Sequence, residues 1–171
     1  MMIHHISIPA NDPLHVAQVL AEVFDGKVGI FPPNPNSYMV VAGDEYGTMI
    51  EIYPSGSVVV PGQGGPFGVA RSANRQAWFQ QNAHPASYSA VHAAISVPTN
   101  LEQIERIAAR EGWRVLPCSR DGLFDVIEFW VENQLMLELL TPAIAHKYLN
   151  AMHPKNLNKL MEDMTQVEVR V

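Results

Sequence analysis

The stretch Ile6-Ser7-Ile8-Pro9-Ala10-Asn11 returns later in the chain as Ile95-Ser96-Val97-Pro98-Thr99-Asn100. Each copy begins with the alternating aliphatic residues of a strand and ends at a polar residue that can start a helix. Such self-similarity indicates two copies of one structural unit. This repeat is the strongest indication of the fold class.

Both copies continue with a helix and then three strands. The first helix is predicted to begin at Asp12-Pro13, with Asp12 as its N-cap, and to end at Gly26; the second is predicted to end at Gly112. The predicted strands cover residues 27–31, 38–42 and 48–53 in the first copy and residues 113–118, 125–131 and 135–140 in the second. Each half therefore reads β-α-β-β-β.

We predict an α+β fold in which two βαβββ modules, residues 1–54 and 90–142, form a curved mixed sheet or half-barrel cup with helices outside. Residues 55–89 are predicted to be a long connecting segment, because the stretch 54–68 is rich in proline and glycine and favours a loop. Residues 143–171 are expected to form two short C-terminal helices and a tail. One helix covers only one face of a sheet, so a site is expected on the other, open face.

Composition excludes several classes of protein. Hydrophobic residues make up 47% of the 171 residues and charged residues 16%, which is typical of a globular protein. The net charge of -6 argues against a nucleic-acid or anionic-membrane partner. The single cysteine, Cys118, excludes an internal disulfide framework, and no apolar run is long enough to cross a bilayer. We expect a cytoplasmic protein.

Four candidate metal ligands come from the repeat. The interval from His5 to Glu51 equals the interval from His92 to Glu138. Because alternate residues of a strand face opposite sides, all four fall on the face away from the branched aliphatic residues. Two imidazoles and two carboxylates suit one divalent ion such as Zn, Ni, Co, Fe or Mn. A cation would also offset the cost of burying a glutamate among apolar neighbours.

Other interpretations of these residues stay open. The alternative to a metal site is an open face with two surface histidines and two solvated glutamates. His4 is an alternative to His5 as a metal ligand, but strand alternation places the His4 side chain on the helix side of the sheet. Tyr53, Arg71 and Arg75 are candidate substrate contacts, although for the two arginines a solvated helix face is the favoured interpretation.

These motifs resemble a known family. The run from His5 to Asp12, its echo from His92, and the endings Met-Ile-Glu51-Ile-Tyr-Pro and Met-Leu-Glu138-Leu-Leu-Thr-Pro resemble the vicinal oxygen chelate superfamily. That group includes glyoxalase I, extradiol dioxygenases, fosfomycin-resistance enzymes and bleomycin-resistance proteins. The resemblance implies one metal ligand on the first and last strand of each module, and the His-Glu-His-Glu set looks most like metal-dependent glyoxalase I.

The sequence also departs from individual members of that superfamily. Glyoxalase I commonly has an arginine that helps to bind glutathione where this chain has Pro9, so glutathione as a co-substrate is not implied. Extradiol dioxygenases usually have histidine where this chain has Glu51. The motifs therefore indicate the superfamily more strongly than any one of its activities.

The resemblance implies an enzyme, a metal-dependent isomerase or lyase that acts on a small vicinal hydroxy-carbonyl substrate through a metal-stabilised enediolate. Glu138 or Glu51 would be the catalytic base, and Glu138 is favoured. A non-catalytic small-molecule-binding protein of the bleomycin-resistance type and a structural dimer are the alternatives. We expect a homodimer, with the two modules pairing either within one chain or across the dimer.

Overall fold

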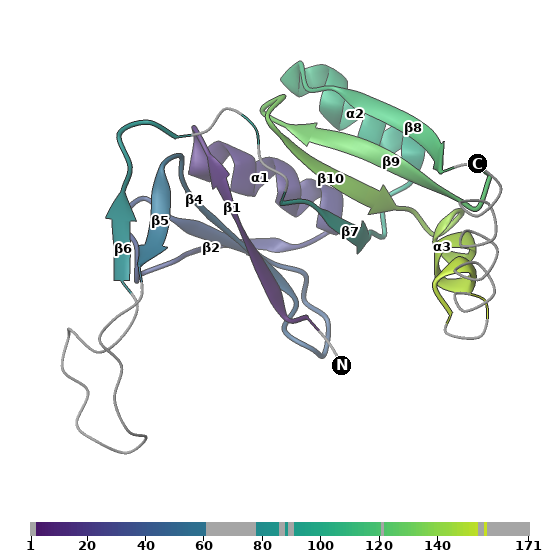
Figure 1. The fold of residues 1–171 in the computed structure, drawn as a ribbon, viewed down its shortest axis with the longest axis horizontal. Coiled ribbons are helices and arrows are strands. Elements are labelled where there is room, and N and C mark those ends of the chain that lie inside the picture. The colour runs from purple at the N-terminus through teal and green to yellow at the C-terminus, as the bar shows by residue number, and fades with distance from the viewer. Residues whose placement is uncertain are drawn as a thin grey trace, which may run out of the picture. The chain divides into compact units, whose positions relative to one another are not determined.

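The computed structural model describes residues 3–60, 78–85, 88, 91–120, 122–153 and 156. The chain divides into two compact units, unit 1 (Met1–Ser89) and unit 2 (Ala90–Val171). Each unit has a four-stranded mixed sheet with one helix across one face (Figure 1). The predicted α+β class is therefore confirmed.

Unit 1 begins with the predicted β-α-β-β-β order. Its sheet has the strand order β1-β4-β3-β2, with β1 and β4 parallel and the other pairs antiparallel. The elements are β1 (His5–Ala10), α1 (Pro13–Phe24), β2 (Lys27–Ile30), β3 (Tyr38–Val41) and β4 (Met49–Pro54). Because β1 and β4 are paired in parallel, the two predicted ligands of this half lie on adjacent strands.

The ends of α1 follow from local chemistry, with one difference from the prediction. The Asp12 side chain caps the helix by accepting the His15 backbone N–H at 3.1 Å, and Pro13 begins it. The C-cap is Asp25, with φ of 50°, rather than Gly26. A Cβ at Gly26 would lie 2.7 Å from the Val41 carbonyl oxygen, so the glycine is needed for the close approach of β3.

The core of unit 1 lies between α1 and the sheet. Val16, Leu20 and Val23 of the helix are fully buried, and Ile8 of β1 and Ile52 of β4 are buried as well. This is the aliphatic face that strand alternation predicted. The opposite face carries His5 and Ser7 on β1 and is the open face of unit 1.

The sequence predicted a loop at the start of the connecting segment, but the structure shows two strands in this segment. β5 (Ser57–Val60) and β6 (Trp78–Gln81) form an antiparallel two-stranded sheet. The three consecutive valines at positions 58–60 favour a strand, and pairing with β6 satisfies their backbone groups. The sequence analysis missed this pairing because β5 lies in a stretch rich in proline and glycine and β6 follows much later in the chain.

Unit 2 repeats the same arrangement, with the strand order β7-β10-β9-β8 and a parallel β7–β10 pair. Its elements are β7 (Ala93–Ser96), α2 (Leu101–Glu111), β8 (Val115–Arg120), β9 (Phe124–Val131) and β10 (Leu135–Leu140). Asn100 and Gln103 form a capping box at the start of α2, and Gly112 ends it with φ of 68°, as predicted. Phe129 and Leu137 lie fully buried in the core of this unit.

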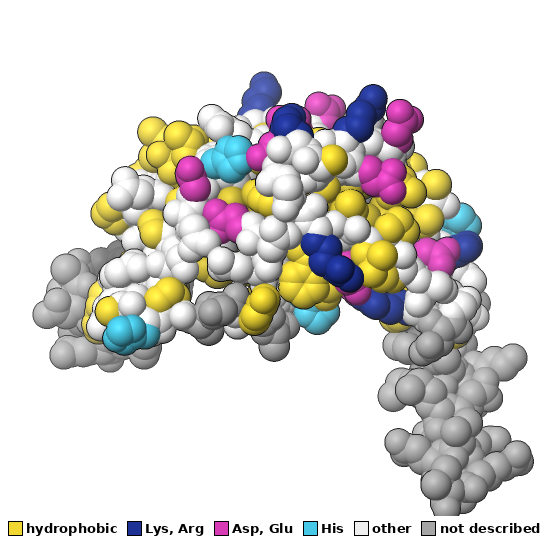
Figure 2. Space-filling view, turned by 90° about the horizontal axis from the view of Figure 1, so that it is seen from above, with side chains coloured by type: hydrophobic (Ala, Val, Ile, Leu, Met, Phe, Trp, Pro, Cys, Tyr) yellow, Lys and Arg dark blue, Asp and Glu magenta, His cyan; other side chains and the backbone are white. Residues whose placement is uncertain are grey.

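The C-terminal region supplies α3 (Ala145–Ala151). The second predicted C-terminal helix falls outside the described residues. None of the helices in the described parts of the chain is long and apolar enough to cross a bilayer. Acidic and basic side chains are interspersed on the face drawn in Figure 2, in keeping with the modest net charge.

Candidate metal centre

Glu51 is the focus of a polar cluster on the open face of unit 1. It is only 7% exposed, and its Oε2 atom accepts hydrogen bonds from the Ser7 hydroxyl, at 2.7 Å, and from the Tyr53 hydroxyl. The parallel register aligns Ser7 with Glu51, which explains the first contact. Tyr53 lies two residues further along β4 and therefore shares the same face.

Tyr53 is held firmly in this cluster. Burial and the hydrogen bond to Glu51 raise the pKa of Tyr53 to about 12. Its ring also contacts Phe31 and Phe79, with centroid distances of 5.4 Å and 5.0 Å. Because Phe79 belongs to β6, the two-stranded sheet supplies one of the aromatic rings that pack against Tyr53.

His5 completes the cluster. Its Nε2 atom lies 3.9 Å from Oε2 of Glu51. Two ligand atoms bonded to one cation at about 2.1 Å lie roughly 3.0–3.5 Å apart, so a shift of under about 1 Å would let the pair share an ion. The other histidine, His4, instead places Nδ1 2.8 Å from the Tyr46 carbonyl oxygen. Unit 1 therefore brings together the His5 and Glu51 pair that the repeat predicted.

Glu138 has an arginine partner on the open face of unit 2. Arg120 Nη2 lies 2.5 Å from Glu138 Oε1 and 3.1 Å from Glu128 Oε1. Glu128 and Glu138 are directly opposite each other in the β9–β10 register, so both carboxylates share one face. The other oxygen of Glu128 accepts the Trp130 indole N–H at 3.3 Å.

The hydrogen bonds within this cluster shift the pKa values of Glu128 and Arg120. Burial alone would raise the pKa of Glu128, but the hydrogen bonds from Trp130 and Arg120 outweigh it, so the pKa lies below its ordinary value. The hydrogen bond to Glu138 raises the pKa of Arg120, with a further contribution from Glu128. One guanidinium therefore balances one of two charges, and the cluster keeps a net charge of -1.

The remaining predicted residues are placed as follows. His92 is exposed and lies immediately before β7, whose Ala94 is paired with Glu138. Arg71 and Arg75 lie outside the described residues. Within the described parts of the chain, no three or more His, Cys, Asp or Glu side chains gather as a metal-binding group. A centre that combines His5, Glu51, His92 and Glu138 therefore stays a prediction.

Protein side chains pair with both of these carboxylates. Burial of Glu51 and Glu138 does not require a cation, because Ser7 and Tyr53 satisfy the first and Arg120 satisfies the second. Among the described residues, no buried side-chain nitrogen or oxygen lacks a hydrogen-bond partner. The residues fit a cation chemically, and each of the two carboxylates also has a protein partner.

Sequence reasoning missed Arg120 and Glu128. Glu128 lies between Ile127 and Phe129, both buried, so strand alternation alone would have placed it on the open face. Arg120 sits at the end of β8, beyond the predicted end of that strand at residue 118. Its pairing with Glu138 spans β9 and could not be predicted without the register.

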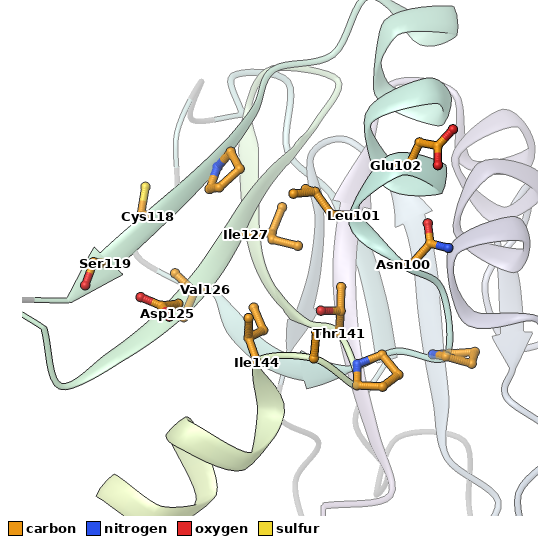
Figure 3. Close-up of a pocket in the computed structure, with 14 residues that line it drawn as sticks. Asn100, Leu101, Glu102, Cys118, Ser119, Asp125, Val126, Ile127, Thr141 and Ile144 are labelled. Atoms are coloured by element: carbon orange, nitrogen blue, oxygen red, sulfur yellow. The ribbon is translucent and has the colours of Figure 1, made fainter.

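Unit 2 also has a cavity of about 690 Å³ that contains none of the predicted ligands. Figure 3 shows Leu101 of α2, Ile127 of β9, and Thr141 and Ile144 of the segment before α3 around it. The residues around it are mostly apolar, and none is basic. Its volume is in the range of small-molecule pockets, but it belongs to the helix side of the sheet rather than to the open face.

Comparison with solved structures gives the same fold. The fosfomycin resistance protein FosX of Listeria monocytogenes, in complex with Mn(II) and sulfate, matches with a TM-score of 0.52 and 14% identity, over 89% of this chain and 98% of that one. Its hexagonal form matches with a TM-score of 0.50 and 13% identity, over 82% and 93%. FosX of Mesorhizobium loti has a TM-score of 0.49 and 15% identity, over 82% and 91%.

No protein-family model and no curated protein sequence matches this chain. At these identities the structural likeness establishes the fold and leaves the activity to be argued from the site. FosX belongs to the vicinal oxygen chelate superfamily, whose short motifs the repeat resembles. The chain therefore has the fold of the FosX proteins.

Proposed function

We propose that the protein is a metal-dependent enzyme that acts on a small substrate with two adjacent oxygen atoms, as an isomerase or lyase. The observation that carries this proposal is the cluster in unit 1, where His5 Nε2 lies 3.9 Å from the nearly buried Glu51 carboxylate on an open sheet face. An imidazole and a carboxylate on adjacent strands are two ligands of a mixed nitrogen and oxygen site. His92 and Glu138 would supply the equivalent pair from unit 2.

A bound divalent cation would polarise the two substrate oxygens and lower the energy of an enediolate. The protein groups would orient the ligands and move the proton. Ser7 and Tyr53 fix Glu51 through two hydroxyl donors, whereas Glu138 is held by one guanidinium. By the resemblance to glyoxalase I, we propose Glu138 as the base that accepts the carbon-bound proton.

A solved structure with the same fold supports a divalent cation. The FosX structure with a TM-score of 0.52 contains Mn(II), and a divalent ion of that class is what two imidazoles and two carboxylates would hold. Glutathione is not part of the proposal, because Pro9 stands at the position where glyoxalase I commonly has an arginine.

The proposal is tested by calorimetric titration of the metal-free protein with Zn²⁺ and Mn²⁺. His5→Ala, Glu51→Gln, His92→Ala and Glu138→Gln should each weaken binding by about 100-fold or more. His15→Ala and Glu105→Gln, which remove an exposed histidine and an exposed glutamate from the helices, are matched controls and should leave the affinity unchanged. Unchanged affinity in all four ligand variants would refute the proposal.

A second candidate is a small-molecule-binding protein without metal chemistry. Its specific support is that Arg120 already satisfies Glu138, so the described part of unit 2 is complete without a cation. Metal analysis of the purified protein separates the two candidates. Nearly one transition-metal ion per chain supports the enzyme, whereas metal-free protein with no measurable affinity for divalent ions supports passive binding.

A further inference from the structure

The position of Arg120 raises a question that the proposed metal site does not answer. Its Nη2 atom bridges Glu128 and Glu138, and its side chain is 36% exposed, whereas the two glutamate side chains are only 15% and 13% exposed. If a cation binds Glu138, it takes a carboxylate that the arginine now holds. The guanidinium must then either repel the cation or serve another partner.

We infer that Arg120 is a substrate-binding residue: it holds Glu138 in the metal-free protein, releases it to the cation, and then binds an oxyanion group of the substrate. This inference rests on the proposed function, because it needs a cation at Glu138. It adds the chemical class of the substrate, which is a small molecule that carries a carboxylate or a tetrahedral oxyanion beside its vicinal oxygens.

Release of Glu138 would free a two-donor edge of the Arg120 guanidinium. Within the described parts of the chain, both of its protein contacts are made through Nη2, and Nε and Nη1 have no protein partner. When Glu138 leaves, one N–H of Nη2 becomes free beside an N–H of Nε or Nη1, and such a pair of neighbouring donors matches two oxygens of a carboxylate, sulfate or phosphate. A part-exposed guanidinium with that edge freed is suited to a bidentate anion.

Release from Glu138 would not set the side chain loose. Glu128 would still accept a hydrogen bond from Nη2, and Glu128 is itself held through its second oxygen by the Trp130 indole. Arg120 would therefore remain positioned by β9 while its charge becomes available. Such preorganisation reduces the entropy lost when an anion binds.

The charges also set an order of binding. Arg120, Glu128 and Glu138 together carry a net charge of -1, which opposes an anion. A divalent cation at Glu138 adds two positive charges, and with Glu51 of the proposed site counted as well the sum is zero, so the opposition to an anion is removed. Anion binding near Arg120 should therefore require the metal.

The first test is the affinity for Zn²⁺ in the full-length protein. Arg120→Gln removes a competing cation and should raise the affinity by roughly tenfold, the size expected for a unit charge near a divalent ion under solvent-like screening. Arg120→Lys keeps the charge and should change the affinity little. Arg106→Gln, an exposed charge on the helix side paired with Glu102, is the matched control and should have no effect.

The second test is anion binding, measured by NMR through the Trp130 indole N–H with acetate and sulfate as probes. At least one probe should shift this signal in the Zn²⁺-loaded wild type but not in the metal-free protein, and the shift should disappear in Arg120→Gln and weaken in Arg120→Lys. Acetate and sulfate distinguish a planar from a tetrahedral oxyanion. Zinc binding with no effect of Arg120 in either test would overturn this inference alone, and absence of zinc binding in the wild type would overturn the proposed function as well.

Discussion

Replacing Tyr53 with phenylalanine tests the cluster around Glu51. The change removes the hydroxyl that donates to Glu51 Oε2 and keeps the ring that contacts Phe31 and Phe79. A hydrogen bond to a charged group contributes about 1.5–3 kcal/mol. Because Ser7 still donates to the same oxygen, we expect a loss of about 1–2 kcal/mol in the free energy of unfolding at pH 8.

The pH dependence of this variant has a definite sign. The pKa of Tyr53 is raised in the folded protein from 10.0 to about 12, so its contribution is complete below pH 10 and is lost as the pH rises towards 12. Two pKa units correspond to about 2.7 kcal/mol, which solvent screening reduces to about 1–2 kcal/mol. The stability difference between wild type and Tyr53→Phe should therefore shrink between pH 10 and pH 12.

Urea unfolding at several pH values and ultraviolet titration of the phenols measure both effects. The chain has five tyrosines, and Tyr53→Phe should remove the one that ionises near pH 12. Tyr88→Phe is the matched control, because Tyr88 is 71% exposed and its loss should leave the stability unchanged. Equal stability of Tyr53→Phe and wild type at pH 8, with no change in the high-pH phenol titration, would refute the reasoning.

Two further predictions concern the scaffold that positions the site, both measured by urea unfolding. Asn133→Ala should destabilise the protein by about 2 kcal/mol, because Asn133 has φ of 57° and its side chain donates to the Gly112 carbonyl at 3.0 Å; Asn133→Gly, which accepts that φ, should lose less. Gly26→Ala should cost about 1–3 kcal/mol, because its Cβ would lie 2.7 Å from the Val41 carbonyl oxygen; a stability equal to wild type would contradict the close approach.

Much of the fold could be predicted because its information is local. The repeated Ile-Ser-Ile/Val-Pro stretch marks two equivalent units. The Asp12 N-cap and the Gly112 C-cap each lie next to the helix end that they identify. Strand alternation likewise put His5 and Glu51 on one open face. The β5–β6 pairing could not be predicted, because its strands are separated by a long stretch of chain.

The candidate site was predictable in part for the same reason. Alternation identifies which face a glutamate occupies but not which side chain reaches it from another strand. The bridge from Arg120 to Glu138 depends on the registers of both β8 with β9 and β9 with β10. The contact of Arg120 with Glu138 could therefore be recognised only in the structure. It shows that this carboxylate already has a cationic partner, which would compete with a metal ion.

Pulsed electron paramagnetic resonance of Mn²⁺ bound to protein labelled with ¹⁵N-histidine tests most directly whether one ion takes ligands from both modules. The account predicts couplings to two imidazole nitrogens, one of which is lost in His5→Ala and the other in His92→Ala. A bound ion with no imidazole coupling, or with couplings that survive in both variants, would contradict it.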